Sequence, residues 1–173
     1  IEIETDVLQP WQKVTKRLVD IIISFKGMLL LSPLLLYLAI RVKASSPGRV
    51  FYSQERIGKN GKPFRIYKFR TMRTDAENGK PMLTSNDDDR VTPLGRQLRK
   101  YRLDELPQLW NVLLGDMSLV GPRPERKFFI DQIIQEAPQY QLLQRIRPGI
   151  TSLGMVKFGY AHNVSEMMLR MRY

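Results

Sequence analysis

The chain has 173 residues, which fits one domain and leaves little room for a second. It carries 28 Lys and Arg residues against 17 Asp and Glu residues, a net charge of +11. This balance indicates a polyanionic partner such as nucleic acid, an anionic membrane surface or a phosphorylated substrate. The chain contains no cysteine, so disulfides, thiolate nucleophiles and cysteine-ligated zinc are excluded.

The first predicted element is an apolar segment at residues 18–40. As a straight helix it would be about 35 Å long, enough to cross a bilayer core of about 30 Å. Asp20 and Lys26 interrupt the apolar run, and Pro33 inside it removes a helix hydrogen bond. Ser32 can bond to a carbonyl that Pro33 leaves free.

Basic residues flank this segment on both sides, whereas a spanning helix usually collects them at its cytoplasmic end. They are Lys13, Lys16 and Arg17 before it, and Arg41, Lys43 and Arg49 after it. We therefore predict a re-entrant helix-break-helix, broken at Ser32-Pro33, with both ends on the cytoplasmic face. A kinked spanning helix and a buried helix of a soluble protein are the alternative interpretations.

A β-hairpin is predicted at residues 50–72 because two runs with high β propensity flank Asn60-Gly61, a strong turn signal. In the second run the period of two places four residues on one face: Phe64, Ile66, Lys68 and Arg70. Lys68 and Arg70 could form the floor of an anion site, or they could belong to a solvated strand end. The spacing does not distinguish these interpretations.

The next residues, 73–92, are polar and are predicted to form a solvated loop. Three successive Asp residues at 87–89 lack the spacing of a calcium loop. Amphipathic helices are predicted at residues 94–101 and 126–137, the second ending near Pro138, and a turn at residues 147–151 leads into a short strand. Either helix could lie at a membrane interface or pack in an ordinary core.

Two adjacent acids, Asp104 and Glu105, stand between a basic run and an apolar helical pattern. With Asp104 as N-cap, Pro107 falls in the first helical turn, where proline is tolerated. The two acids could simply cap this helix and favour its dipole. Alternatively, a helix N-terminus surrounded by arginines is suited to phosphate binding; the arginines are Arg96, Arg99, Arg102 and Arg123.

The second interpretation predicts a specific division of roles within the acid pair. A carboxylate about 4 Å from an arginine gains roughly 4 kcal/mol at an effective dielectric constant near 20. Asp104 is therefore expected to stay ionised, which suits a nucleophile. Carboxylate and phosphate repel each other unless a cation lies between them, so Mg²⁺ on Glu105 is the expected cofactor.

Several motifs resemble those of the bacterial sugar transferases that are monotopic polyprenyl-phosphate phosphoglycosyltransferases. They are KRLVDIIIS, LSP, YKFRTM, RLDELPQLWNVLLGDMSLVGPRP and RPGIT, spread over residues 16–151. The resemblance implies transfer of a sugar 1-phosphate from a UDP-sugar to undecaprenyl phosphate, with release of UMP, as the first membrane step of exopolysaccharide, O-antigen or glycoconjugate synthesis. It places the protein at the bacterial cytoplasmic membrane, with the active site on the cytoplasmic face.

The resemblance also implies the site. Asp104 would form a covalent phosphosugar intermediate, Glu105 would bind Mg²⁺, and Ser32-Pro33 would be the break in the membrane helix. The substrate-binding cations are predicted to be Lys68, Arg70, Arg99, Arg123 and Arg147.

The predicted fold is mixed α/β, a single catalytic domain over residues 1–173 with its catalytic core at 94–158. It is monotopic, with the re-entrant helix, the β-hairpin and amphipathic interfacial helices. The expected partners are the UDP-sugar, undecaprenyl phosphate and membrane lipids rather than nucleic acid, and homo-oligomer formation stays open. The rival functions are a non-catalytic basic adaptor at the membrane surface and, from net charge alone, a nucleic-acid-binding protein.

Overall fold

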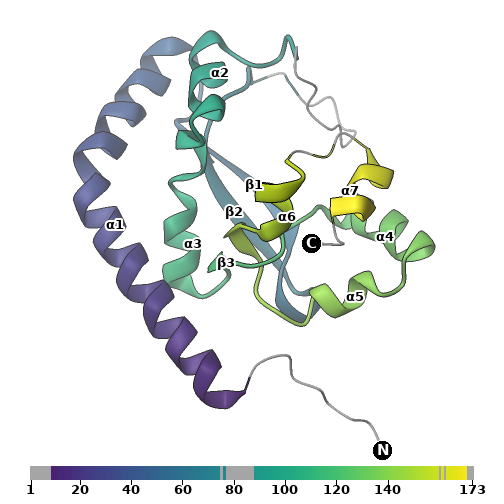
Figure 1. Ribbon diagram of the computed structural model, residues 1–173. Helices are drawn as coiled ribbons and strands as arrows, with labels where there is room; N and C mark the ends of the chain where they lie inside the picture. Colours follow the sequence, from purple (N-terminus) through teal and green to yellow (C-terminus); the bar gives the residue numbers. More distant parts are fainter. Residues whose placement is uncertain (1–8, 75, 77–87, 160, 162, 171–173) are drawn as a thin grey trace, which may run out of the picture.

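A computed structural model describes residues 9–74, 76, 88–159, 161 and 163–170. One long helix, α1 (Pro10–Ser45), lies along one side of a domain built from a β-hairpin and short helices (Figure 1). The helices α4 (Lys127–Glu136), α5 (Tyr140–Leu143) and α7 (Val164–Arg170) lie on the opposite side of the hairpin from α1. The mixed helix and strand composition agrees with the predicted fold class.

The predicted break at Ser32-Pro33 is wrong, because α1 continues through both residues as one helix of 36 residues. Pro33 has no N–H to donate to the carbonyl of Leu29, four residues earlier. The Ser32 hydroxyl donates to that carbonyl instead, at 2.8 Å. A replacement donor therefore keeps the helix continuous across the proline, and Figure 1 shows α1 bent rather than divided.

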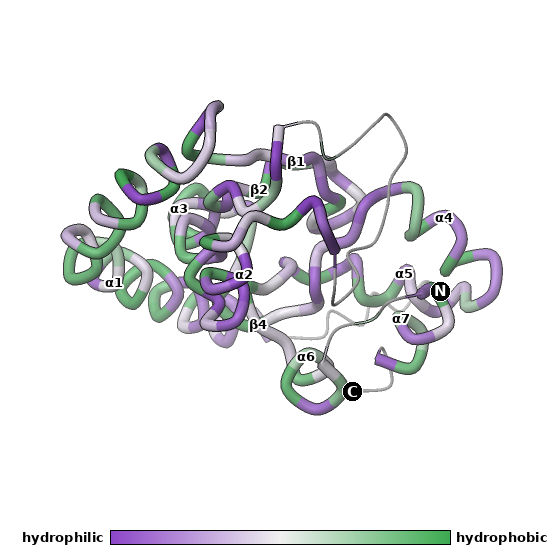
Figure 2. The backbone as a smooth tube through the Cα atoms, turned by 90° about the horizontal axis from the view of Figure 1, so that it is seen from above, coloured by the Kyte–Doolittle hydropathy of each residue, from purple (hydrophilic) through white to green (hydrophobic). Residues whose placement is uncertain are grey.

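Much of α1 is apolar, as its green segments in Figure 2 show, and many of its apolar side chains are exposed. Leu29 and Leu30 are 65% and 77% exposed. The helix is long and apolar enough to cross a membrane, and only 11% of its most apolar window is buried. The interpretation as the buried helix of a soluble protein is therefore wrong.

The first half of α1 is fixed to the domain by its polar residues. Asp20 is buried and accepts hydrogen bonds from Ser118 Oγ at 2.7 Å and from the Leu119 amide at 3.1 Å. Arg17 donates to the carbonyls of Val112 and Leu113 at 2.5 and 3.0 Å. Asp20, which interrupts the apolar sequence, therefore faces the protein and not lipid.

The second half of α1 packs on the same domain. Leu38 and Val42 form a buried cluster with Phe69 and Leu98. Arg70 donates to carbonyls at the end of the helix, those of Val42 at 3.2 Å, Ser46 at 2.7 Å and Pro47. Both halves of α1 therefore contact one body of protein.

The predicted hairpin is confirmed as β1 (Phe51–Ile57) paired antiparallel with β2 (Pro63–Phe69). The turn η1 (Lys59–Gly61) has φ of 56° at Asn60 and 73° at Gly61, the left-handed conformation that Asn and Gly adopt most easily. The buried side chain of Asn111 covers the free edge of β2: it accepts from the Tyr67 amide at 3.0 Å and donates to the Arg65 carbonyl at 2.7 Å.

Helices α2 (Pro93–Lys100) and α4 match the helices predicted at residues 94–101 and 126–137, whereas α5, α6 (Leu153–Lys157) and α7 were not predicted. Helix α2 is N-capped by Thr92, whose hydroxyl accepts from the Gly95 amide at 3.0 Å.

The strand β3 (Ser118–Val120) pairs in parallel with β4 (Gly149–Thr151). The predicted strand therefore exists but lies within residues 147–151, the segment predicted to be a turn before it. Most of the polar loop predicted at residues 73–92 lies outside the described residues. Of its three successive Asp residues, Asp88 forms an ion pair with Arg90 at 2.6 Å.

Helix α4 is part of a core rather than an interfacial helix. Its buried residues Phe129, Ile130 and Ile133 pack with Tyr140 of α5 and Met167 of α7. For α4, therefore, the structure favours the core interpretation over the membrane-interface interpretation. This cluster forms one wall of the cavities described below.

Candidate active site

The acid pair lies in the turn η2 (Leu103–Glu105), and α3 (Gln108–Leu114) begins three residues later. The prediction that Asp104 is the N-cap of the helix is therefore wrong. Pro107 has no N–H for the Leu103 carbonyl, which instead accepts from the Leu106 amide at 3.4 Å. The chain makes a tight 3₁₀ turn at this point, and Asp104 and Glu105 are both buried within it.

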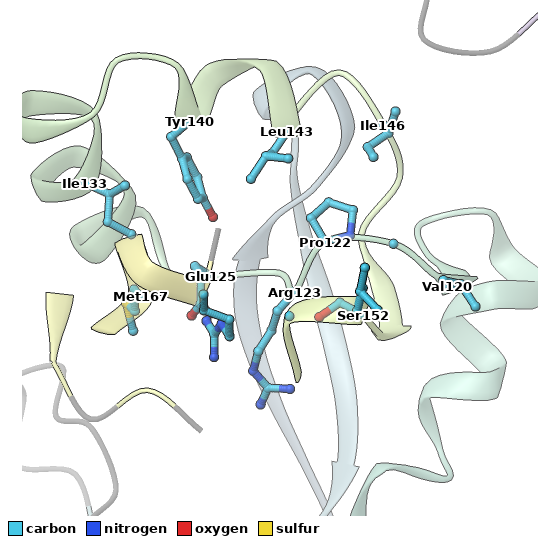
Figure 3. A pocket seen from close by; sticks show the side chains of 14 residues that line it. Val120, Pro122, Arg123, Glu125, Ile133, Tyr140, Leu143, Ile146, Ser152 and Met167 are labelled. Carbon is cyan, nitrogen blue, oxygen red and sulfur yellow. The ribbon is translucent and has the colours of Figure 1, made fainter. Parts of the chain in front are cut away.

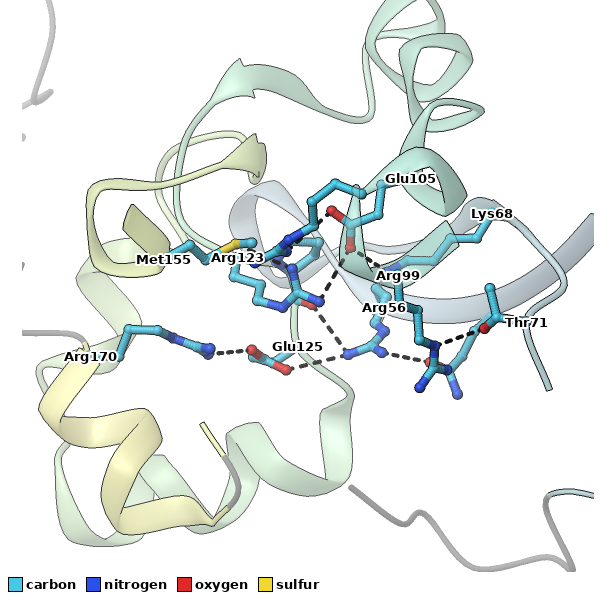
Figure 4. Close-up of polar contacts among 12 residues, drawn as sticks. Arg56, Lys68, Thr71, Arg99, Glu105, Arg123, Glu125, Met155 and Arg170 are labelled. Atoms are coloured by element: carbon cyan, nitrogen blue, oxygen red, sulfur yellow. Dashed lines mark hydrogen bonds and ion pairs between the residues drawn. The ribbon is translucent and has the colours of Figure 1, made fainter. Parts of the chain in front are cut away.

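Three cations surround the carboxylate of Glu105 (Figure 4). Lys68 Nζ lies 2.7 Å from Oε1, Arg123 Nη2 lies 3.5 Å from Oε1, and Arg102 Nη1 lies 3.6 Å from Oε2. Burial by itself raises the pKa of Glu105, but the charges of Lys68, Arg123 and Arg102 outweigh it and lower that pKa to about 2. Glu105 is therefore ionised at neutral pH.

Asp104 has the opposite environment. No described residue forms an ion pair with it, and its Oδ1 is buried without a hydrogen-bond partner in the described chain. Burial raises the pKa of Asp104 and the neighbouring charge of Glu105 adds to this, while Lys68 and Arg99 oppose it. The expectation that a nearby arginine favours the ionised form holds for Arg99, but burial and the charge of Glu105 outweigh it, and the pKa of Asp104 is raised overall. The carboxylate of Asp104 keeps free lone pairs.

Of the predicted substrate-binding cations, Lys68, Arg99 and Arg123 come together at this site. Arg99 Nε donates to Thr71 Oγ1 at 2.9 Å. Arg123 Nη1 approaches Met155 Sδ at 3.2 Å, which fixes the guanidinium beside Glu105. Lys68 itself is paired with Glu105 at 2.7 Å, so each of the three cations has a protein contact at the site.

Arg70 and Arg147 occupy other places. Arg70 lines the same cavity, but its guanidinium binds the carbonyls at the end of α1. Arg147 is exposed, and its Nε donates to the Gly115 carbonyl at 2.9 Å, at the C-terminal end of α3. The geometry gives both residues structural contacts and does not bring Arg147 to the site.

A second buried acid, Glu125, was not anticipated from the sequence. Its Oε1 lies 2.7 Å from Arg170 Nη2 and its Oε2 lies 3.3 Å from Arg56 Nη1 (Figure 4). Burial lowers the pKa of Arg56, and the charge of Glu125 opposes that shift. The three residues are far apart in the chain, so spacing offers no signal; an acid directly after GPRP in a basic chain is the one hint.

Both acid clusters line one cavity of about 820 Å³, whose charged lining residues are mostly cations. Its described lining holds three acids, Asp104, Glu105 and Glu125, and twelve cations. The cations are Arg49, Arg56, Lys68, Arg70, Arg73, Arg90, Arg96, Arg99, Lys100, Arg123, Arg126 and Arg170. A cavity with this charge is suited to a ligand with several phosphate charges.

The acid pair can supply part, but not all, of the ligand set of a divalent cation. The described residues contain no group of three His, Asp or Glu side chains that could enclose a metal. Mg²⁺, however, usually binds one or two carboxylates together with phosphate oxygens of a substrate. Glu105, and Asp104 with its unpartnered Oδ1, offer that partial set of oxygen ligands.

Comparison with known proteins identifies the family. The profile of the bacterial sugar transferases matches residues 11–173. The chain is 43% identical over 158 residues to a UDP-N-acetylgalactosamine-undecaprenyl-phosphate N-acetylgalactosaminephosphotransferase of Aeromonas hydrophila, covering 91% of the chain and 37% of the relative. It is 43% identical over 145 residues to a UDP-glucose:undecaprenyl-phosphate glucose-1-phosphate transferase of Escherichia coli, covering 83% of the chain and 31% of the relative.

A third relative is the exopolysaccharide production protein PSS of Rhizobium leguminosarum, 41% identical over 151 residues, covering 83% of the chain and 74% of the relative. The chain therefore spans about a third of the length of the first two relatives and about three quarters of the third. It belongs to the bacterial sugar transferase family.

Proposed function

We propose that this protein transfers a sugar 1-phosphate from a UDP-sugar to undecaprenyl phosphate at a membrane surface, with Asp104 as nucleophile. The observation that carries the proposal is the division of charge within the buried acid pair. Glu105 takes the ion pairs of Lys68, Arg102 and Arg123, whereas Asp104, in the same cavity, keeps an oxygen that no described residue contacts by a hydrogen bond. A nucleophilic carboxylate needs such an oxygen.

In the first step, a carboxylate oxygen of Asp104 attacks the phosphorus that bears the sugar. The bond from this phosphorus to the bridging oxygen of the diphosphate breaks, and UMP leaves with the electron pair. Lys68, Arg99 and Arg123 lie beside Asp104 and Glu105 and would neutralise the charge on the diphosphate. The product is an aspartyl phosphosugar.

In the second step, a phosphate oxygen of undecaprenyl phosphate attacks the same phosphorus. The bond between phosphorus and the Asp104 oxygen breaks, which restores the carboxylate and gives an undecaprenyl diphosphate sugar. The burial of Asp104 keeps bulk water from the intermediate, which would otherwise hydrolyse.

We also propose that Glu105, together with diphosphate oxygens of the donor, holds Mg²⁺. The cation would neutralise part of the negative charge of the diphosphate when bound. Glu105 suits this role because its low pKa keeps it ionised throughout the pH range of the cell.

The topology of α1 belongs to the same proposal. Asp20 contacts β3 and Val42 contacts Arg70, and these residues are about 33 Å apart along a helix, close to the thickness of a bilayer core. If α1 crossed the membrane, the domain would have to lie on both sides of it. These contacts support a monotopic arrangement in which α1 stays at one face of the membrane. We propose that this face is the cytoplasmic face of the bacterial inner membrane.

The test uses the purified protein in lipid nanodiscs with Mg²⁺ and a panel of UDP-sugars, without undecaprenyl phosphate. Intact mass and UMP release are recorded for the native chain and for Asp104→Asn. A mass increase equal to one sugar phosphate, absent in the variant, is the expected result. The absence of both adduct and UMP with every donor, in this chain and in a longer one that extends to the full length of its relatives, would favour the adaptor interpretation.

A further inference from the structure

A second cavity of about 250 Å³ adjoins the active site (Figure 3). It lies between α5, the start of α6 (Leu153–Lys157) and α7, and we refer to it as the α5–α7 cavity. Four of its lining residues also line the larger cationic cavity: Arg123, Glu125, Met167 and Arg170. The two cavities are therefore adjacent, with Arg123 at their boundary.

The lining of this cavity differs from that of the cationic one. Leu143, Ile146 and Leu153 contribute apolar walls, while Tyr140 and Ser152 contribute hydroxyls. In Figure 3, Tyr140 and Leu143 point into the cavity from α5, and Ser152 lies across from them. Such a lining suits a neutral group with one apolar face and a few hydroxyls.

The two hydroxyls are able to donate hydrogen bonds. Burial and the charge of Glu125 raise the pKa of Tyr140, so its phenol stays protonated. Ser152 Oγ accepts from the Met155 amide at 3.0 Å, which leaves its own O–H to donate. Each can therefore serve a hydroxyl or carbonyl oxygen of a ligand.

Arg123 connects this cavity to the chemistry. Its Nη2 lies 3.5 Å from Glu105 Oε1, and its side chain lines the α5–α7 cavity. A ligand with a phosphate beside Arg123 and Asp104 could therefore extend its uncharged end into the cavity. A UDP-sugar has two such ends, the sugar and the uridine.

The two proposed half-reactions distinguish these ends. The sugar stays attached to the reacting phosphorus through both steps, whereas the position of UMP must be vacated and then filled by a lipid phosphate. Because the lipid phosphate arrives from the membrane, the leaving-group position must open toward α1. The cationic cavity reaches that helix through Arg70, which binds the Ser46 carbonyl at the end of α1. Helices α5 and α7, which line the α5–α7 cavity, lie on the far side of the domain from α1 in both overall views (Figures 1 and 2). Among the described residues the cavity approaches α1 at Val120, whose carbonyl accepts from Lys16 Nζ at 3.1 Å, before the apolar segment of α1 begins.

We propose that the α5–α7 cavity is the sugar subsite and that Tyr140, Leu143 and Ser152 select the sugar. This inference rests on the proposed function, because it assumes a UDP-sugar donor and an aspartyl phosphosugar. The ligand class is a neutral hexose or N-acetylhexosamine. Its ring carbons or acetyl methyl would meet the apolar walls, and its oxygens would meet the two hydroxyls.

The experiment compares neighbouring positions of α5. Leu143→Trp fills the cavity, whereas Leu142→Trp adds the same group at a position that is 55% exposed. Each variant, in nanodiscs, is assayed for adduct formation with UDP-glucose and UDP-N-acetylgalactosamine and for inhibition by UMP. The isolated adduct is then mixed with undecaprenyl phosphate to measure the second half-reaction, which contains no uridine.

For Leu143→Trp we expect at least a tenfold fall in kcat/KM, a changed ratio between the two donors, a slower second half-reaction and an unchanged inhibition constant for UMP. Leu142→Trp should match the native chain in all four. If Leu143→Trp weakens UMP binding and leaves the donor ratio and the second half-reaction unchanged, the cavity holds uridine and the proposal is overturned.

Tyr140→Phe is a second variant, which tests the same proposal if Leu143→Trp does not fold. It removes one hydroxyl and keeps the ring, so we expect an effect of about tenfold on one donor relative to the other. An equal effect on both donors together with weaker UMP inhibition would again overturn the proposal. Failure of the proposed function is distinct, because the native chain would then form no adduct with any donor.

Discussion

Glu105 and Glu125 are both buried acids held by several cations, and both line the same cavity. They differ in what lies beside them. Next to Glu105 stands Asp104, a second carboxylate whose Oδ1 has no hydrogen-bond partner in the described chain. Glu125 instead joins Arg56 of β1 to Arg170 of α7.

The difference separates two uses of the same kind of ion cluster. Around Glu105 the cations neutralise one acid and leave its neighbour free for chemistry. Around Glu125 they connect the hairpin to the C-terminal helix, because the three residues come from distant parts of the chain. We therefore expect substitutions in the first cluster to affect activity most and those in the second to affect stability most.

The largest effect is expected for Asp104→Asn. The variant keeps the shape of the side chain but removes the nucleophile, so adduct formation should fall by about 10³-fold or more. Stability should stay the same or rise, because an unpaired buried carboxyl with a raised pKa is replaced by a neutral amide. Intact mass and thermal unfolding in nanodiscs give both values. A variant that loses activity only through unfolding would contradict this assignment.

Glu105→Gln should cause the next largest loss of activity. It leaves Lys68, Arg102 and Arg123 without their common anion and removes the proposed Mg²⁺ ligand. We expect a fall of about 10²-fold in adduct formation and an altered dependence on Mg²⁺ concentration, with a loss of stability of about 3 kcal/mol. A Mg²⁺ titration of UMP release checks this, and an unchanged midpoint would rule out Glu105 as a ligand.

Glu125→Gln is the matched control, because it removes one charge from the other cluster. Breaking a buried ion cluster costs about 3–5 kcal/mol, so thermal unfolding should shift as much as for Glu105→Gln or more. Adduct formation below the unfolding temperature should change by less than about tenfold. A Mg²⁺ midpoint that shifts in this variant would show that the two clusters do not act separately.

The smallest expected effect is a difference between the pH dependence of activity and that of stability. Glu105 has its pKa lowered from 4.5 to about 2, so its contribution to stability is present above pH 4.5 and is lost as the pH falls toward 2. Asp104 has its pKa raised, so it takes up its proton at a higher pH than Glu105. As the pH is lowered, the rate of adduct formation should therefore fall before the protein begins to unfold. Parallel profiles of the two measurements check the order, and coincidence of the two declines would contradict it.

Local signals in the sequence predicted the local structure well. Asn60-Gly61 located the hairpin, Pro138 marked the end of a helix, and the motif around Asp104 identified the acid pair. The predictions were wrong where one backbone hydrogen bond decided the outcome. Ser32 replaces the donor that Pro33 lacks, and Pro107 turns the start of α3 into a 3₁₀ turn.

Long-range contacts were beyond the reach of spacing. The charge state of Asp104 depends on its burial and on the positions of Lys68, Arg99 and Glu105, and Lys68 forms its ion pair with Glu105 instead. The buried pair of Asp20 and Ser118 is 98 residues apart, and the link between Glu125 and Arg170 spans 45 residues. Each of these contacts follows from the fold and not from any motif.

The contacts of Asp20 also set an order of events during synthesis. Its two hydrogen-bond partners, Ser118 and Leu119, leave the ribosome nearly a hundred residues later, about 5–20 s at typical elongation rates. During that interval the apolar face of α1 can already enter a bilayer, while its polar face has nothing to bind. The nascent chain would thus meet the membrane first, and the catalytic domain would assemble on a helix already resting there.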